Sequence, residues 1–313
     1  MKEIVYERYG SVDVLHQVEA PTPVPAAHQL RIAVKAVALN PLDWKLFEGQ
    51  MKFVTGSKFP RKVGIEFAGI VAATGSAVTR FKQGDEVFGL LDAFQGGALA
   101  EEILVTEADL AAKPAKLSFA EAAALPIGGL SALQMLTELA PVEAGMEVLI
   151  NGATGGVGMF ATQLAKRRGA RVTAAVSTRG VALAERWRAD VVHDYRKESV
   201  LALSQRFDIV LDLSDKLPFA AARPLLKAKA TYVNAMPNPK DIALGFFHNL
   251  ISRQQRKILM MKARPEALAS LAKDASEWLE VVVGNTYPMA SFKEAYRETR
   301  ASGSLGKSVI VIG

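Results

Sequence analysis

The chain has 313 residues, of which half are hydrophobic and 22% are charged. This length and composition suit two domains with substantial cores and exclude general disorder. The chain contains no cysteine, which excludes disulfide frameworks, thiol nucleophiles and zinc sites that need a thiolate. The formal net charge is +6, but the basic residues are scattered. That distribution favours a solvated surface over a nucleic-acid or membrane interface.

No segment has the pattern of a membrane span or a signal peptide. The longest uncharged stretch, residues 122–137, is too short for a span and is interrupted by proline and glycine. The N-terminus opens on charged residues and an alternating run that is typical of a strand. We therefore expect a soluble, cytoplasmic protein that has no membrane partner.

The first 117 residues are predicted to form a β-rich unit. Short apolar runs alternate with turns that contain glycine, and helical periodicity is rare. The expected strands are residues 31–37, 64–74, 85–90 and 99–105.

The pattern changes at Ser118, which forms a predicted capping box with Glu121 and so marks a helix start. After an alanine-rich helical stretch, strands and helices alternate as far as residue 235. The expected strands are residues 147–151, 171–176, 191–192, 207–213 and 230–235, and the expected helices are residues 157–168 and 181–188. Such alternation indicates a doubly wound α/β domain, with a parallel sheet covered by helices on both faces.

The C-terminal part has a third pattern. Residues 265–280 are amphipathic, Ser291 and Glu294 suggest a second capping box, and residues 308–312 suggest a strand. A strand that follows a completed α/β domain needs a sheet to join, and the N-terminal β-rich unit is the expected host. The sequence therefore predicts one discontinuous domain of residues 1–117 and 265–313, with residues 118–264 inserted as the second domain.

The most specific motif is the sequence VLINGATGGVG at residues 148–158, between a predicted strand and a predicted helix. This context is typical of a dinucleotide-binding loop, although alanine replaces the first glycine of the consensus. Gly155 would let the backbone approach a pyrophosphate, and Gly158 would let the helix pack on the sheet. A tight turn that needs glycine only for packing is the alternative. We expect the pyrophosphate to contact the helix N-terminus and its loop at Thr154, Gly155, Gly156 and Val157.

The second strand of this unit ends near Ser177, about 20 residues past the glycine loop, where NAD-preferring sites usually carry an acid. Here the segment has no acid, and the Arg179 guanidinium could pair with a 2′-phosphate. Tyr195, after the third strand, could add a hydroxyl or a ring face to the adenosine end. A plain surface role for Arg179 is the alternative. The sequence thus predicts NADPH as the cofactor.

Together, the β-rich domain, the glycine loop and the returning C-terminal strand resemble the medium-chain dehydrogenase/reductase superfamily over essentially the whole chain. Residues 40–45 (NPLDWK) and 64–69 (GIEFAG) resemble its zinc-free quinone oxidoreductase branch, the zeta-crystallin-like proteins. Residues 43–49 and 125–134 are most similar to chloroplast-envelope-type quinone oxidoreductase homologues and enone reductases. The resemblance implies an α/β fold in which a Rossmann doubly wound parallel sheet is inserted into a β-rich GroES-like catalytic domain.

The same comparison implies that no metal is bound. Asn40 stands where zinc-dependent members have their first cysteine ligand, and Ile65 stands where they have a histidine. The chain's histidines do not have ligand-like spacing either; they are His16, His28, His193 and His248.

The resemblance places Asn40 and Lys45 beside the nicotinamide as catalytic residues. Lys45 could stabilise an enolate or deliver a proton, or equally could hold the cofactor's ribose or phosphate. Asp43 is expected to be structural, holding its loop or pairing with Lys45, and Glu66 to fix the shape of its turn. The other cofactor contacts implied by the resemblance are Ser131, Ala235, Gly306 and Lys307.

Without a Lewis acid, a conjugated acceptor is favoured because it spreads the charge that hydride addition creates. We therefore expect a zinc-independent, NADPH-dependent reductase of the conjugated C=C bond of enones and enals, acting on a small hydrophobic carbonyl. An NADPH:quinone oxidoreductase is the alternative, and an NADPH-binding protein with an RNA-binding or scaffold role is a further one. Trp44, Phe246 and Phe247 could flank the acceptor. The resemblance also implies a homodimer, formed along an edge near residues 257–262.

Overall fold

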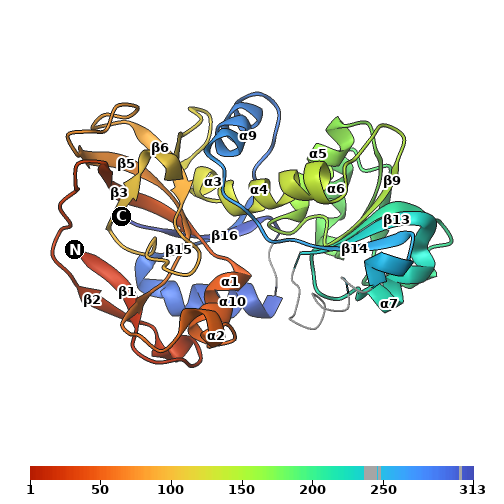
Figure 1. The fold of residues 1–313 in the computed structure, drawn as a ribbon, viewed down its shortest axis with the longest axis horizontal. Helices are drawn as coiled ribbons and strands as arrows, with labels where there is room; N and C mark the ends of the chain where they lie inside the picture. The colour runs from red at the N-terminus through yellow and green to blue at the C-terminus, as the bar shows by residue number, and fades with distance from the viewer. Residues whose placement is uncertain (236–244, 246–247, 303–304) are drawn as a thin grey trace. The chain divides into compact units, whose positions relative to one another are not determined.

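The computed structural model describes residues 1–235, 245, 248–302 and 305–313, which form two compact units (Figure 1). The first unit comprises residues 1–127 and 263–313, and the second comprises residues 128–262. The first boundary lies later than the expected 117/118 because helix α3 (Phe119–Ala123) packs on strands β3 (Gln29–Ala38) and β5 (Glu66–Thr74) of the first unit. In this division the second unit is inserted between the two segments of the first.

Two sheets build the first unit, as far as the chain is described. A three-stranded antiparallel sheet has the order β2-β1-β4, with β1 at Lys2–Tyr6, β2 at His16–Glu19 and β4 at Arg61–Lys62. The larger sheet has the order β15-β16-β3-β5-β6-β8, with β7 also paired to β3. Its strands are β3 (Gln29–Ala38), β5 (Glu66–Thr74), β6 (Glu86–Leu90), β7 (Glu102–Thr106), β8 (Leu110–Ala112), β15 (Val283–Pro288) and β16 (Lys307–Val311).

The C-terminal strand joins the N-terminal sheet, as the sequence predicted. Strand β16 runs antiparallel to β3, with Ile310 opposite Val37. Along β3, buried and half-buried positions alternate, and the buried side chains of Leu30, Ile32 and Val34 enter the core of the unit. The two ends of the chain therefore share one hydrophobic core.

Short helices cover this unit: α1 (Pro41–Phe47), α2 (Lys52–Thr55), α3, α9 (Pro265–Glu277) and α10 (Phe292–Ser302). The capping box of α3 is confirmed, because Ser118 Oγ accepts from the Glu121 N–H at 3.2 Å and Glu121 Oε2 accepts from the Ser118 N–H at 2.8 Å. The cap expected at Ser291 is wrong. Ser291 lies inside the 3₁₀ turn Met289–Ser291, and the extended backbone typical of a cap is found at Pro288 instead.

The second unit is a parallel sheet with the strand order β11-β10-β9-β12-β13-β14 in its described part. The strands are β9 (Glu147–Asn151), β10 (Arg171–Val176), β11 (Val191–Asp194), β12 (Phe207–Asp212), β13 (Leu226–Asn234) and β14 (Gln254–Ile258). The strand order reverses between β9 and β12, and this arrangement confirms the predicted doubly wound Rossmann-like fold.

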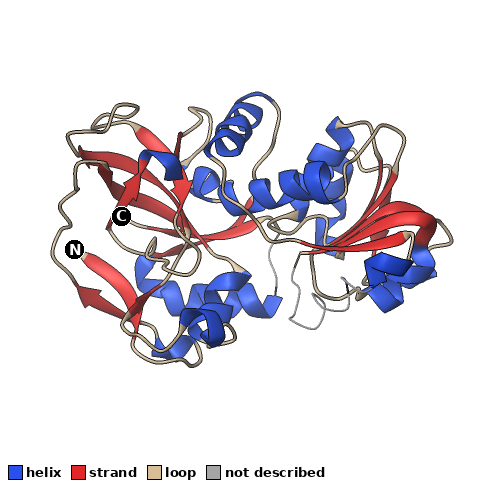
Figure 2. Cartoon of the chain, viewed as in Figure 1, coloured by secondary structure: helices blue, strands red, loops and turns tan. Residues whose placement is uncertain are grey.

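Helices flank this sheet (Figure 2). They are α5 (Gly158–Arg167), α6 (Val181–Arg186) and α7 (Phe219–Ala222). Helix α4 (Pro126–Gln134) has its first two residues in the first unit and the rest in the second. Helix α5 packs on β9 and β10, α6 on β10 and β11, and α7 on β13. In neither unit does a described helix have the length and apolar character needed to cross a bilayer.

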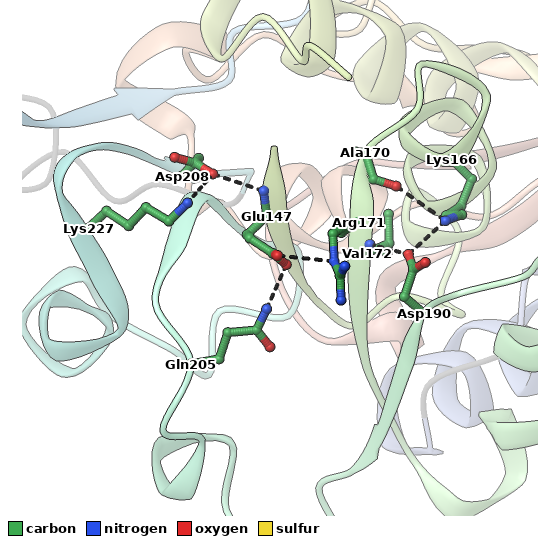
Figure 3. A network of polar contacts seen from close by, with 9 residues as sticks. All are labelled: Glu147, Lys166, Ala170, Arg171, Val172, Asp190, Gln205, Asp208 and Lys227. Atoms are coloured by element: carbon green, nitrogen blue, oxygen red, sulfur yellow. Dashed lines mark hydrogen bonds and ion pairs between the residues drawn. The ribbon is translucent and has the colours of Figure 1, made fainter. Parts of the chain in front are cut away.

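Figure 3 shows a polar network at the amino ends of β9, β10 and β12. Asp208 Oδ2 accepts from the Glu147 N–H at 2.9 Å, and Asp190 Oδ2 accepts from the Val172 N–H at 2.7 Å. Each of these carboxylates also pairs with a lysine, Lys227 for the first and Lys166 for the second. The network fixes the strand starts and leaves the opposite, carboxyl edge of the sheet for a site.

Candidate active site

The carboxyl edge of the second unit's sheet gathers most of the predicted cofactor residues. After β9, β11, β12, β13 and β14, a main-chain hydrogen bond ties the first loop residue to the neighbouring strand. Examples are Gly152 N–H to the Ala175 carbonyl and Tyr195 N–H to the Val176 carbonyl, both at 3.0 Å. The loops therefore leave the sheet side by side. They carry Thr154, Gly155, Gly156, Val157, Ser177, Arg179, Tyr195 and Ala235.

The glycine loop has one glycine that the protein needs for packing and one that it does not. A Cβ on Gly158 would lie 2.1 Å from the Gly152 carbonyl oxygen, so only glycine lets α5 start this close to the sheet. A Cβ on Gly155 would meet no atom nearer than 3.5 Å. Gly155 thus leaves space above the loop that the protein itself does not fill, and this space fits the close approach of a pyrophosphate.

The turn after β10 packs directly on the glycine loop. A Cβ on Gly180 would lie 2.4 Å from Oγ1 of the buried Thr154. The same turn carries Arg179, which is exposed and whose guanidinium makes no hydrogen bond or ion pair with the described residues. An unpaired guanidinium next to the glycine loop can hold a phosphate group.

Asp194, which the sequence analysis missed, lies at the end of β11 beside this turn. Its Oδ2 accepts from Thr178 Oγ1 at 2.8 Å, and its Oδ1 accepts from the Arg196 N–H at 2.9 Å. Burial acts to raise the pKa of Asp194, but these two hydrogen bonds and the nearby charges outweigh it and lower the pKa. The acid of NAD-preferring sites usually follows the second strand, whereas Asp194 ends the third strand and is brought to this turn by the pairing of β11 with β10.

A buried polar network, also missed, supports the glycine loop from below. Asp212 Oδ1 accepts from Asn151 Nδ2 and from Ser214 Oγ, both at 3.0 Å, and Asp212 Oδ2 accepts from the Leu217 N–H at 3.1 Å. These bonds join the carboxyl ends of β9 and β12, and Asn151 is the residue just before the loop. The sequence does carry a signal for this network, because Asn151 and Asp212 are polar residues at the ends of otherwise apolar strands.

Ser131 is buried on α4. A Cβ on Gly128, one turn earlier, would lie 2.3 Å from the Gly156 carbonyl oxygen, so this part of α4 packs closely on the glycine loop. The structure thus places Ser131 on a helix that contacts the loop, and its cofactor contact stays a prediction.

In the first unit, Asn40 belongs to a buried polar cluster with Glu66 and Lys307. Lys307 Nζ lies 2.5 Å from Asn40 Oδ1 and 2.5 Å from Glu66 Oε1, and Asn40 Nδ2 donates to Glu66 Oε1 at 2.9 Å. Glu66 Oε2 accepts from the Ile127 N–H at 2.8 Å. Glu66 therefore joins β5, β16 and the start of α4, and it lies in β5 rather than only shaping a turn.

Gly306 sets the start of β16 and so the position of Lys307. Its φ is +65°, and a Cβ there would lie 1.9 Å from the Val282 carbonyl oxygen. The structure shows a backbone reason for Gly306 and a buried, bonded ammonium for Lys307. The cofactor contacts predicted for both residues stay predictions.

Asp43 is buried at the first turn of α1, where its Oδ2 accepts from the Asn40 N–H at 2.9 Å. Burial, with the Glu66 charge, raises the pKa of Asp43 to about 7 against the opposing effects of the Asn40 bond, Lys307 and Tyr296. Burial likewise raises the pKa of Tyr296 well above its usual value, and the Asp43 charge raises it further. The structure thus packs two carboxyl groups around one ammonium.

The predicted pairing of Asp43 with Lys45 is wrong, because residues two apart on a helix point in different directions. The half-buried Lys45 side chain forms neither a hydrogen bond nor an ion pair within the described part of the protein. Its ammonium is therefore available to a ligand, and the catalytic roles of Lys45 and Asn40 stay predictions.

The remaining sequence predictions concern metals and aromatic residues. Among the residues that the structure describes, no group of three or more His, Asp or Glu side chains is placed to hold a metal ion. Ile65 is buried. Trp44 packs against the core of the first unit, whereas Phe246 and Phe247 lie outside the described residues.

Comparison with known proteins gives the family. Residues 26–115 match the alcohol dehydrogenase GroES-like domain, and residues 187–310 match the zinc-binding dehydrogenase family. The chain is 32% identical to a chloroplastic quinone-oxidoreductase homolog of Spinacia oleracea over 99% of this chain and 98% of that protein. It is 38% identical to the chloroplastic NADPH-dependent alkenal/one oxidoreductase of Arabidopsis thaliana over 68% of this chain and 57% of that protein.

Among solved structures, the quinone oxidoreductase from Coxiella burnetii matches with a TM-score of 0.90 and 30% sequence identity, covering 100% of this chain and 99% of that one. The GroES-like domain and the Rossmann-like sheet expected from the sequence are both present. The chain therefore belongs to the medium-chain dehydrogenase/reductase superfamily of oxidoreductases and has quinone oxidoreductase and enone reductase homologues among its relatives.

Proposed function

We propose that this chain is a zinc-independent, NADPH-dependent reductase of the conjugated C=C bond in α,β-unsaturated aldehydes and ketones. The observation that carries this proposal is the carboxyl edge of the β9–β13 sheet. There the space above Gly155 adjoins a turn whose Arg179 has no partner among the described residues. This pairing suits a dinucleotide that carries an extra phosphate.

Each part of this edge has a proposed role in binding. The amides of Gly156 and Val157, at the start of α5, hold the pyrophosphate at the positive end of the helix. Arg179 pairs with the 2′-phosphate, and the exposed Tyr195 ring covers the adenosine end. When bound, the reduced nicotinamide supplies a hydride for the acceptor. Asp194 opposes the phosphate electrostatically, so the preference for NADPH depends on the balance between it and Arg179.

A conjugated acceptor is proposed because it stabilises its own developing charge. Asn40 and Ile65 stand at the positions where the zinc-dependent relatives would have ligands, and neither an amide nor an alkyl side chain is a good zinc ligand. Lys45 is the side chain we propose to face the developing oxyanion and to donate its proton there, because its ammonium has no partner within the described residues. The relative named as an alkenal/one oxidoreductase supports this choice of acceptor.

Quinones are the second candidate, because the relative from Spinacia oleracea and the structure from Coxiella burnetii are both named for quinone oxidoreductases. A quinone also spreads the added charge, into an aromatic hydroquinone. We propose in addition a cytoplasmic homodimer that associates along β14, the edge strand of this sheet among the described residues, near the exposed Met260. Both plant relatives are named chloroplastic, so cell fractionation tests the location and sedimentation tests the dimer.

The deciding experiment measures NADPH oxidation against a panel of enones, enals, quinones and saturated aldehydes, using NADPH deuterated at the transferable position. Enone reduction predicts deuterium on the β-carbon of the saturated ketone. Quinone reduction predicts a hydroquinone with no carbon-bound deuterium. Efficient reduction of saturated aldehydes by metal-depleted protein, or no binding of NADPH, would contradict the proposal.

A further inference from the structure

Lys307, Asn40 and Glu66 form a buried cluster in which two of the three side chains carry a charge. The Lys307 and Glu66 side chains are 6% and 0% exposed, so the ammonium and the carboxylate are both out of water. Burial of either charge alone would be costly, whereas the pair is close to neutral and bonded at 2.5 Å.

The three groups fix the direction of the Asn40 amide. A lysine ammonium can only donate, so it must contact the amide oxygen, and a carboxylate can only accept, so it must contact the amide nitrogen. The contacts follow this rule, with Lys307 Nζ at Asn40 Oδ1 and Glu66 Oε1 at Asn40 Nδ2. A flipped Asn40 amide would place its oxygen against the carboxylate and its nitrogen against the ammonium.

The arrangement also polarises the amide. A cation bonded to the amide oxygen draws electron density from the nitrogen and makes both of its N–H groups stronger donors. One of them is used by Glu66 at 2.9 Å, and the Ala38 carbonyl takes the other at 3.3 Å. This second bond is long, so a better acceptor can replace it at low cost.

We propose that Lys307 is a positioning residue that orients and polarises the Asn40 amide, so that the second Nδ2–H of Asn40 donates to the developing oxyanion of the bound acceptor. Lys307 acts through Asn40 and does not contact the acceptor. The inference deepens the proposed function and rests on it, and it assigns Lys307 a different role from the cofactor contact that the family resemblance implies.

The test separates an effect on turnover from an effect on stability by comparing a single variant, which leaves one buried charge unpaired, with a double variant that removes both charges. Lys307→Met leaves Glu66 as a buried, unpaired carboxylate and is expected to lower the unfolding midpoint. Adding Glu66→Gln removes that charge and is expected to recover most of the stability, because the buried pair is then neutral. Turnover is expected to stay roughly 10- to 100-fold below the parent in both variants, with NADPH affinity unchanged within about twofold. Lys82→Met, at a side chain that is 86% exposed, is the matched control.

Two further measurements do not depend on turnover. The Asn40 Nδ2 protons, assigned by NMR in the cofactor-free protein, are expected far downfield in the parent and shifted upfield in Lys307→Met/Glu66→Gln. Asn40→Ala is expected to lower turnover less in that background than in the parent, because the Asn40 donor is already weakened and no longer held in its direction.

Several outcomes overturn the inference. Normal turnover in the stable double variant would make Lys307 a purely structural residue, and weaker NADPH binding with normal turnover at saturation would make it a cofactor contact. Unchanged chemical shifts of the Asn40 Nδ2 protons in the double variant would show that Lys307 does not polarise the amide. Failure of the parent protein to bind NADPH or to reduce any conjugated acceptor would instead refute the proposed function, and the shift measurement would still report on the cluster.

Discussion

The main-chain N–H of Asn40 donates to Asp43 Oδ2 at 2.9 Å, and this bond joins the candidate catalytic amide to a second buried carboxyl group. Lys307 neutralises Glu66, so Asp43 has no full positive partner of its own. Asp43 therefore retains its proton up to about pH 7, and the cluster stays close to neutral below that pH.

Protonation of Asp43 predicts how stability depends on pH. The pKa of Asp43 is 3.8 in its ordinary state and about 7 when folded, so between these values the folded protein binds a proton that the unfolded chain has lost. The contribution of Asp43 to the free energy of unfolding therefore falls as pH rises from about 4 to 7, by at most on the order of 4 kcal/mol in total. Above pH 7 it stays constant. Urea unfolding at a series of pH values measures this change.

Asp43→Asn is the matched variant, because the amide oxygen can still accept from the Asn40 N–H while the charge is lost. The variant is expected to match the parent near pH 4 and to be more stable at pH 8. Other carboxyl groups titrate in both proteins, so the difference between the two curves isolates Asp43. A constant difference across this range would show that Asp43 is ionised throughout.

Gly155 and Gly158 of the glycine loop (residues 152–158) should respond differently to replacement by alanine. Gly158→Ala places a Cβ 2.1 Å from the Gly152 carbonyl oxygen and is expected to destabilise the fold by about 1–3 kcal/mol. Gly155→Ala has room in the protein and is expected to leave the unfolding midpoint unchanged while weakening NADPH binding at least tenfold. Calorimetry with and without NADPH checks both. Unaltered NADPH binding by Gly155→Ala would contradict the pyrophosphate position.

The balance between Arg179 and Asp194 predicts cofactor preference. Arg179→Ala should weaken NADPH binding by about 10- to 100-fold, the loss of a charge-assisted bond, and leave NADH binding nearly unchanged. Asp194→Asn retains an acceptor for the Arg196 N–H but removes the negative charge, so it should strengthen NADPH binding only. Arg253→Ala, at an exposed arginine just before β14, is the control. If Arg179→Ala weakened the binding of NADPH and NADH equally, Arg179 would not be the residue that pairs with the 2′-phosphate.

The features that the sequence predicted correctly are those that depend on residues close together in the chain. Alternating or continuous apolar runs identified most strands, and the glycine loop identified the carboxyl edge as a site, because each signal depends on residues close together in the chain. Strand β14 shows the limit. The sheet edge was expected near residues 257–262, but the edge strand β14 is Gln254–Ile258, and its first four residues are polar. Main-chain pairing with β13, a tertiary effect, overrides the weak local preference of these residues.

The sequence did not reveal the two polar clusters, for a related reason. Lys307, Glu66 and Asn40 come from three distant segments, and only the pairing of β16 and β5 with β3 brings them together. Asp194 likewise meets Thr178 only because β11 lies next to β10. Single-residue arguments could assign each residue a type of chemistry, but they could not supply the partner that decides its charge.

A Lys45 variant can distinguish the two roles that the family resemblance implies for this residue, a catalytic group and a contact to the cofactor's ribose or phosphate. Its side chain has no bonds within the described residues, so Lys45→Ala should leave the unfolding midpoint unchanged. If the ammonium faces the developing oxyanion, turnover at saturating NADPH should fall about 100-fold while NADPH affinity stays constant. Lys116→Ala, at an exposed lysine of the same unit, controls for the change in net charge. A rise in the Kd for NADPH with unchanged turnover would instead make Lys45 a cofactor clamp, and the proton donor would then have to be sought elsewhere.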